Sequence, residues 1–368
     1  MTAPPIRPQI KVLVVDDSAF MRTALSRIIG SDPELIVVGA AASGSEALER
    51  IPILNPDVIT LDVQMPGLNG LETLRSIMAR HPRPVIMVSS ATVKDAEITF
   101  NALGAGAFDY VPKQLSPTSL DIIHIQRELI EKIKVAAESR FAPSYNGSKL
   151  FPTLRSTGSE AFSLVPAVVA IGVSTGGPQA LQEILPLFPK DISVPILIVQ
   201  HMPRGFTAPF ARRLNTLCSM QVREAAHEEI IQSGVIYIAP AGIHMMVERR
   251  PDSRAAICLA TLPEKHLHMP SVDVLMESVA SVYRSLAMGI IMTGMGSDGS
   301  SGMQAIQRAG GITIGQDQAT CAVYGMPRVC YEMGILQRVV PLSQIPQQVL
   351  SATQYRKRSF AAAAGTLT

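Results

Sequence analysis

The sequence has 368 residues, of which 47% are apolar and 17% are charged, and its formal net charge is +2. This composition excludes an intrinsically disordered chain, and the near-neutral charge argues against the basic surface of a nucleic-acid-binding protein. The length favours two domains, because a single domain usually has about 100–200 residues.

The N-terminal segment and the cysteines indicate the compartment. Residues 1–10 are proline-rich and contain no apolar signal-peptide core. No apolar run approaches the ~20 residues that a membrane-spanning helix needs. The four cysteines, Cys218, Cys258, Cys321 and Cys330, form no CxxC pair and are typical of reduced thiols. We therefore expect a cytoplasmic protein without membrane insertion.

A first run of alternating strand and helix patterns predicts a domain over residues 8–136. Helix-like stretches separate its apolar segments, and Ser18 can cap the first helix. Near-continuous apolar strands between amphipathic helices indicate a parallel sheet covered on both faces, so we predict a doubly wound (βα)5 α/β fold. The predicted strands are Ile10–Val15, Leu35–Val38, Val58–Leu61, Val85–Ser89 and Phe108–Val111.

Polar side chains lie where these predicted strands end: Asp16 and Asp17, then Asp62, Ser89 and Lys113. Each could be a helix cap or a surface charge, but five of them in order at strand ends favour a shared site. The carboxyl ends of parallel strands border one crevice, where ligands bind. Three converging carboxylates would repel one another without a cation, and hard oxygen ligands suit Mg²⁺. The set fits phosphoryl transfer onto an aspartate.

These segments resemble the response-regulator receiver domains. The resemblance implies that Asp62 accepts a phosphoryl group from a sensor histidine kinase. It also implies a Mg²⁺ site made by Asp17, Asp62 and the backbone carbonyl of Gln64, with Asp16 helping through water. The matching segments are Leu13 to Ser18, Leu61 to Gly67, Met87 to Ser90 and Tyr110 to Lys113.

The same resemblance implies three further roles in the receiver domain. Ser89 and Tyr110 would be switch residues that respond to phosphorylation, and Lys113 would contact the phosphoryl oxygens.

The strand and helix pattern stops over residues 137–165, where Ser, Gly, Pro and Thr dominate, and this segment is predicted to be a linker. The pattern resumes over residues 166–352, which predicts a second parallel-sheet α/β domain. Residues 353–368 are expected to form a disordered tail. The predicted strands of the second domain are Val168–Val173, Pro195–Val199, Val235–Ala239, Met288–Thr293 and Ile312–Gly315.

The segment from Gly172 to Gly176 follows the first of these strands and matches G-x-S-x-G, with Ser174 in the centre. This pattern is typical of a nucleophilic serine on a tight turn between a strand and a helix. A phosphate-binding loop is excluded, because no G-x-x-x-x-G-K follows. An ordinary glycine-rich turn with a capping serine is an equally good interpretation of the motif alone.

His201 and Asp298 follow two other predicted strands, so that Ser174, His201 and Asp298 would share one sheet edge. This suits a nucleophile, its general base and the carboxylate that orients the base. The chain order Ser, His, Asp differs from the Ser, Asp/Glu, His order of the α/β-hydrolases, so the motif does not indicate that fold.

Several residues compete for these roles on spacing alone. Asp317 also follows a predicted strand and rivals Asp298. His227 and His244 are alternatives to His201, with His244 following a strand after a further loop. His266 and His268 could bind a metal, but no third ligand is near them, and a surface loop is the better interpretation.

The second domain resembles the catalytic domain of chemotaxis protein-glutamate methylesterases. The resemblance implies a triad of Ser174, His201 and Asp298, and an oxyanion bound with help from the backbone N–H of Met295. The matching segments are Ile171 to Pro178, Gln200 to Pro203, Gly205 to Thr207, Pro270 to Asp273, Thr293 to Gly299 and Tyr324 to Pro327.

The resemblance implies a phosphorylation-controlled hydrolase without a cofactor for the ester reaction. Its substrates would be glutamate methyl esters on the cytoplasmic helices of chemotaxis receptors, with deamidation of receptor glutamines as a second reaction. A transcription regulator is disfavoured, because the second half has no helix-turn-helix pattern and no basic face. The same esterase chemistry in a non-chemotaxis sensory array stays open, whereas a complete triad argues against a purely binding role.

Overall fold

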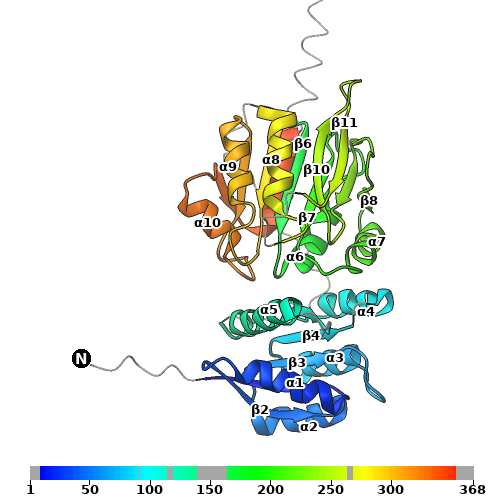
Figure 1. Ribbon diagram of the computed structural model, residues 1–368, viewed down its shortest axis with the longest axis vertical. Helices are drawn as coiled ribbons and strands as arrows, with labels where there is room; N and C mark the ends of the chain where they lie inside the picture. The colour runs from blue at the N-terminus through cyan, green and yellow to red at the C-terminus, as the bar shows by residue number, and fades with distance from the viewer. Residues whose placement is uncertain (1–8, 91, 114–118, 139–163, 263–267, 354–368) are drawn as a thin grey trace, which may run out of the picture. The chain divides into compact units, whose positions relative to one another are not determined.

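The computed structural model describes residues 9–90, 92–113, 119–138, 164–262 and 268–353 (Figure 1). Contacts within the chain divide it into two compact units, residues 1–150 and 151–368. Most of the predicted linker and nearly all of the predicted tail lie outside the described residues. None of the described helices is long and apolar enough to cross a lipid bilayer.

The first unit is a parallel five-stranded sheet with the strand order β2-β1-β3-β4-β5. This is a common order of doubly wound sheets, and it confirms the predicted (βα)5 fold. Its strands are β1 (Ile10–Val15), β2 (Leu35–Ala41), β3 (Val58–Asp62), β4 (Val85–Ser89) and β5 (Asp109–Pro112). Its helices are α1 (Ala19–Gly30), α2 (Gly44–Leu54), α3 (Gly70–Arg80), α4 (Val93–Gly104) and α5 (Ser119–Glu138).

The helices of this unit begin where the sequence supplies hydrogen-bond acceptors. Ser18 caps α1 by accepting a hydrogen bond from the Met21 N–H, as the sequence predicted. Asn69 and Glu72 form a reciprocal capping box at the start of α3. Every residue of β3, β4 and β5 is buried, because helices cover both faces of the sheet.

The second unit contains a parallel seven-stranded sheet with the order β14-β13-β12-β6-β7-β9-β8. Its strands are β6 (Val168–Val173), β7 (Ile196–Gln200), β8 (Gln221–Glu224), β9 (Val235–Ile238), β12 (Ala287–Ile291), β13 (Ile312–Gln316) and β14 (Arg338–Val340). Its helices are α6 (Gly177–Ile184), α7 (Thr207–Leu217), α8 (Val272–Tyr283), α9 (Ser300–Arg308) and α10 (Met326–Glu332), with 3-10 turns at Leu185–Leu187, Arg284–Leu286 and Leu342–Gln344. Residues 345–353 are also helical.

The helices α8 and α9 lie side by side over one face of this sheet (Figure 1). Val272, Met276 and Val279 of α8 belong to the same buried core as Met303 and Ile306 of α9. This core fixes the beginning of α8 relative to the ends of the central strands.

The middle of this sheet is a topological switch point. The chain leaves β6 to form β7 on one side and later returns to form β12 on the other side. In open α/β sheets, ligands bind at the carboxyl ends of the strands at such a point, where the loops diverge and leave a crevice.

An antiparallel pair, β10 (His244–Arg249) with β11 (Ala255–Ala260), was not predicted from the sequence. Met245, Val247 and Ile257 of this pair belong to the core that contains α8. The edge strands β8 and β14 were also not predicted, because they have only four and three residues and little buried apolar periodicity.

Candidate functional site

Ser174 lies in the tight turn between β6 and α6, at the switch point. Its backbone N–H donates to the Thr293 carbonyl at 3.0 Å, beyond Gly172 and Ile291, the last paired residues of β6 and β12. Gly176 then takes a positive φ of 75°, and a Cβ there would lie 2.5 Å from the Ala322 Cβ. The turn therefore needs glycine at this position both for its conformation and for space.

His201 and Asp298 complete a hydrogen-bonded series with this serine. The Nδ1 atom of His201 lies 3.2 Å from the Ser174 Oγ, and its Nε2 atom lies 2.8 Å from the Asp298 Oδ2. In the neutral tautomer that fits both contacts, Nε2–H donates to the carboxylate and Nδ1 accepts from the hydroxyl. The structure thus brings together the three residues that the sequence predicted to share one edge.

The carboxylate of Asp298 is held at the beginning of α8. Its Oδ1 accepts from the Ser271 hydroxyl at 2.8 Å and from the Asp273 N–H at 3.0 Å, and its Oδ2 accepts from the Val272 N–H at 2.7 Å. Burial alone would raise the pKa of Asp298, but the bond and charge of His201 and these backbone donors outweigh it and hold the pKa well below its usual range. The Asp298 carboxylate is therefore ionised and can accept the hydrogen bond from His201 Nε2–H.

The rivals of these residues lie elsewhere. Asp317 accepts from the backbone and hydroxyl of Thr320 in the turn after β13. His227 accepts from the Leu259 N–H, and His244 begins β10 with no exposed surface. His266 lies outside the described residues.

Gly294, which precedes the predicted oxyanion donor, lies against Ser174. A Cβ on Gly294 would lie 2.8 Å from the Ser174 Cβ and 3.1 Å from its backbone N, so only glycine lets the two segments approach this closely. Met295 follows directly, and its backbone N–H is the group that the sequence resemblance assigned to the oxyanion.

His268 and Ser271 contact the triad, although sequence reasoning gave neither of them this place. The His268 ring is exposed, as expected for a surface loop, but it also stacks on the His201 ring with centroids 4.1 Å apart and planes at 21°. Ser271 caps α8 by accepting from the Val274 N–H, and a capping serine before an acidic first turn was a detectable signal.

The acidic residues of the first unit also converge. Carboxylate oxygens of Asp16, Asp17 and Asp62 lie within 4.8 Å of one another. The Lys113 Nζ lies 2.9 Å from Asp16 Oδ2 and 2.7 Å from Asp62 Oδ2. One ammonium leaves negative charge uncompensated, and the donors are hard oxygens, so the residues fit a Mg²⁺ ion.

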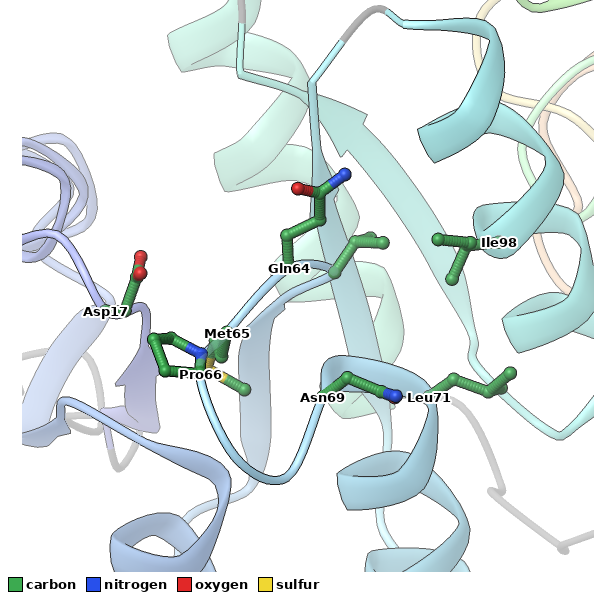
Figure 2. A pocket seen from close by; sticks show the side chains of 8 residues that line it. Asp17, Gln64, Met65, Pro66, Asn69, Leu71 and Ile98 are labelled. Atoms are coloured by element: carbon green, nitrogen blue, oxygen red, sulfur yellow. The ribbon is translucent and has the colours of Figure 1, made fainter.

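A pocket of about 500 Å³ opens beside this cluster. Asp17, Gln64 and Met65 line one side of it, and Ile98 of α4 lies across from them (Figure 2). Burial raises the pKa of Asp62 to about 6, and the Lys113 ammonium opposes this shift in part. The acidic cluster thus has an open approach at the carboxyl edge of the sheet.

The predicted switch residues are both anchored on α4. The Ser89 hydroxyl accepts from the Thr99 hydroxyl at 2.9 Å, and the Tyr110 ring meets Phe100 edge-on with centroids 6.3 Å apart. The side-chain amide of Gln64 also donates to Asp95 of the same helix. Sequence reasoning missed this role of α4, because it had no signal for which helix packs against the strand ends.

Comparisons with known proteins agree with both halves of this description. Residues 12–123 match the response regulator receiver domain family, and residues 169–349 match the CheB methylesterase family. The chain is 44% identical to protein-glutamate methylesterase/protein-glutamine glutaminase 2 of Nitratidesulfovibrio vulgaris, over 93% of this chain and 99% of that protein. It is equally identical to the protein of that family from Pyrococcus horikoshii, over 94% of each chain. The solved catalytic domain of Thermotoga maritima CheB methylesterase is 36% identical, covering 51% of this chain and 98% of that one, with a TM-score of 0.49.

Proposed function

The chain belongs to the protein-glutamate methylesterase/protein-glutamine glutaminase family, and on that premise we propose that Ser174, His201 and Asp298 hydrolyse glutamate methyl esters on chemotaxis receptors. The observation that carries the proposal is the series of contacts from Ser174 Oγ through both ring nitrogens of His201 to Asp298. Because the substrate esters lie on the cytoplasmic helices of receptors, the enzyme acts in the cytoplasm.

The first half of the reaction acylates the serine. The Ser174 Oγ attacks the ester carbonyl while His201 Nδ1 takes the hydroxyl proton, and the ionised Asp298 stabilises the imidazolium. The backbone N–H of Met295 donates to the oxyanion, and a donor of this kind is typically worth about 3 kcal/mol. The Nδ1–H then protonates the departing methoxide, which leaves as methanol.

The second half restores the enzyme. A water molecule gives a proton to His201 Nδ1 and attacks the acyl carbonyl. The bond between Ser174 Oγ and the acyl carbon then breaks, Nδ1–H returns the proton to Ser174 Oγ, and the glutamate side chain is released as a free carboxylate. A primary amide presents the same carbonyl geometry, so receptor glutamines are deamidated by the same steps with ammonia as the leaving group.

The receiver unit supplies control by phosphorylation. Asp62 accepts a phosphoryl group from a sensor histidine kinase, and Lys113 contacts the phosphoryl oxygens. Asp17, Asp62 and the Gln64 backbone carbonyl would hold Mg²⁺, with Asp16 helping through water, and the bound ion would supply positive charge to offset the carboxylates and the phosphoryl group. The buried hydroxyl of Ser89 and the ring of Tyr110 respond to the new charge.

The decisive test is methanol release from purified methylated receptors by the full-length chain. Ser174→Ala should lose activity by about 10⁶-fold, as is typical when a triad nucleophile is removed, while folding and phosphorylation at Asp62 stay unchanged. A variant that retains more than a few per cent of the wild-type rate would remove Ser174 from the nucleophile's role.

A further inference from the structure

The strand pairing that supports the catalytic edge ends one residue before the nucleophile and the base. The last paired residues of β6 and β7 are Val173 and Gln200, which are partners in the parallel ladder. The carbonyl groups of Ser174 and His201 therefore lie just beyond the ladder. Their orientation depends on donors from outside the sheet.

The Gly177 N–H donates to the Ser174 carbonyl at 2.8 Å, and the side chain of Gln200 donates to both carbonyls. Its Nε2 donates to the Ser174 carbonyl at 2.9 Å and to the His201 carbonyl at 3.0 Å. The opposite orientation of the amide would place its oxygen against two carbonyl oxygens, so the contacts define which end is the nitrogen. Among the described residues, no other hydrogen bond to the His201 carbonyl is recorded.

The residues around Gln200 leave just enough buried space for its side-chain amide. The residue is 2% exposed, and a Cβ on Gly177 would lie 2.1 Å from its Oε1. That oxygen is buried and has no hydrogen-bonding partner among the described residues. An unpaired buried acceptor opposes folding, so the amide is a poor choice if only stability mattered.

We propose that Gln200 is a positioning residue, whose amide joins the backbone of the nucleophile to the backbone of the general base. The two bonds replace the ladder where β6 and β7 end, and they fix the distance between Ser174 Oγ and His201 Nδ1. The proposal rests on the proposed function, because it assigns Gln200 to the same reaction. The two hydrogen bonds would hold the serine and the histidine at the distance that proton transfer requires, and a misplacement of about 1 Å can lower the rate strongly.

Gln200→Met tests the proposal, because it keeps the length of the side chain and removes both donors. In the full-length enzyme, kcat for methanol release should fall about 10–100-fold with KM changed less than twofold. Labelling of Ser174 by a small phosphonate ester, which needs no receptor, should slow by a similar factor. A kcat within threefold of wild type, or a loss confined to KM, would overturn the proposal.

Thr313→Val is the matched control. Thr313 is fully buried on β13, and its hydroxyl donates to the Ile335 carbonyl at 2.6 Å. This variant also loses a buried donor, so its thermal unfolding temperature should drop while kcat stays unchanged. An equal loss of kcat in Thr313→Val would mean that general destabilisation, not positioning, explains Gln200→Met.

Gln200→Glu provides a second measurement if Gln200→Met fails to fold. A protonated carboxyl can donate one of the two bonds, whereas a carboxylate can donate neither. The activity of this variant relative to wild type should therefore rise as the pH falls from 8 to 5, and a flat ratio contradicts hydrogen-bond donation. A wild-type chain that releases no methanol at all would instead refute the proposed function.

Discussion

The tautomer of His201 is set by the hydrogen-bonding partners of its two ring nitrogens. The ionised carboxylate of Asp298 requires a proton on Nε2, which leaves Nδ1 to accept the proton of Ser174. The His201 contact and the backbone donors at the beginning of α8 hold the pKa of Asp298 below its usual range, which keeps this carboxylate ionised. At this scale, the orientation of one ring decides whether the serine can be activated.

His268 should contribute to that orientation through its ring rather than through its charge. Stacked aromatic pairs are worth about 0.5–1.5 kcal/mol, so His268→Ala should lower kcat several-fold. His268→Phe keeps a flat ring and should restore most of the rate. Steady-state kinetics of both variants would check this. If Phe is as poor as Ala, the stacking account is wrong.

At the scale of elements, the beginning of α8 acts as the anchor for the orienting carboxylate. Free backbone N–H groups and the positive end of the helix dipole favour a negative charge there. The Val272 and Asp273 N–H groups both donate to the Asp298 carboxylate. Ser271 caps the helix through its bond with the Val274 N–H, and its hydroxyl donates to the same carboxylate. The helix thus links core packing to the geometry of the base.

Ser271→Ala should therefore weaken both stability and catalysis. Loss of a helix cap typically costs about 1 kcal/mol of stability, and loss of the bond to Asp298 should lower kcat about tenfold. Ser43→Ala is a matched control, because Ser43 caps α2 by accepting from the Glu46 N–H in the other unit. Urea unfolding and methanol release would be compared, and equal kcat values in the two variants would contradict the anchoring role.

Asp273 should make stability depend on pH. Burial, with a smaller effect of the Asp298 charge, raises the pKa of Asp273 to about 6. The folded protein then holds this proton more tightly than the unfolded chain, so the contribution to stability is complete below about pH 4 and is lost as the pH rises through 6.

Asp273→Asn removes this titration and keeps an oxygen that can accept from the Gly302 N–H. The variant should gain about 1–2 kcal/mol relative to wild type between pH 4 and 7, a range reduced for the partial exposure of the group. Urea unfolding at both pH values measures the difference. A difference that does not change with pH would refute the prediction.

At the scale of the whole molecule, a switch and a hydrolase occur in one chain as two separate α/β units. Each has its own sheet and its own candidate site at the carboxyl ends of its strands. Phosphorylation of Asp62 would add up to about two negative charges near Gln64 and Ser89, whose side chains are hydrogen-bonded to α4. Control of the hydrolase must therefore be a coupling between sites in different units.

Phosphorylation should raise the rate of methanol release by the full-length chain. Couplings of this type are commonly 1–3 kcal/mol, which corresponds to about 5–150-fold. The rate would be measured with Mg²⁺ and a small acyl phosphate as the phosphodonor. Asp62→Asn is the control and should not respond, so an equal response of this variant would place the acceptor elsewhere.

The two α/β units and the candidate residues at their strand ends could be predicted from the sequence. Apolar runs predict the central strands, and segments with helical spacing predict the helices between them. A side chain that can act as a nucleophile or a ligand lies at the end of many of these strands, as Ser174 follows β6 and Asp62 ends β3. These are local properties, because the end of a strand is visible in the chain itself. The short strands and the β10–β11 pair were missed, because their burial comes from packing against distant segments.

Which strand ends become neighbours is visible only in the folded protein. Asp298 and Asp317 both follow strands, but β12 lies next to β6, whereas β13 lies one strand further out. That order brings Asp298 to His201 and leaves Asp317 bonded to its own turn. The contact of His268 with His201 and the bridge made by Gln200 likewise join segments whose proximity no local pattern encodes. Spacing along a chain gives the periodicity of each element, while strand order is fixed by how all the elements together bury their apolar faces.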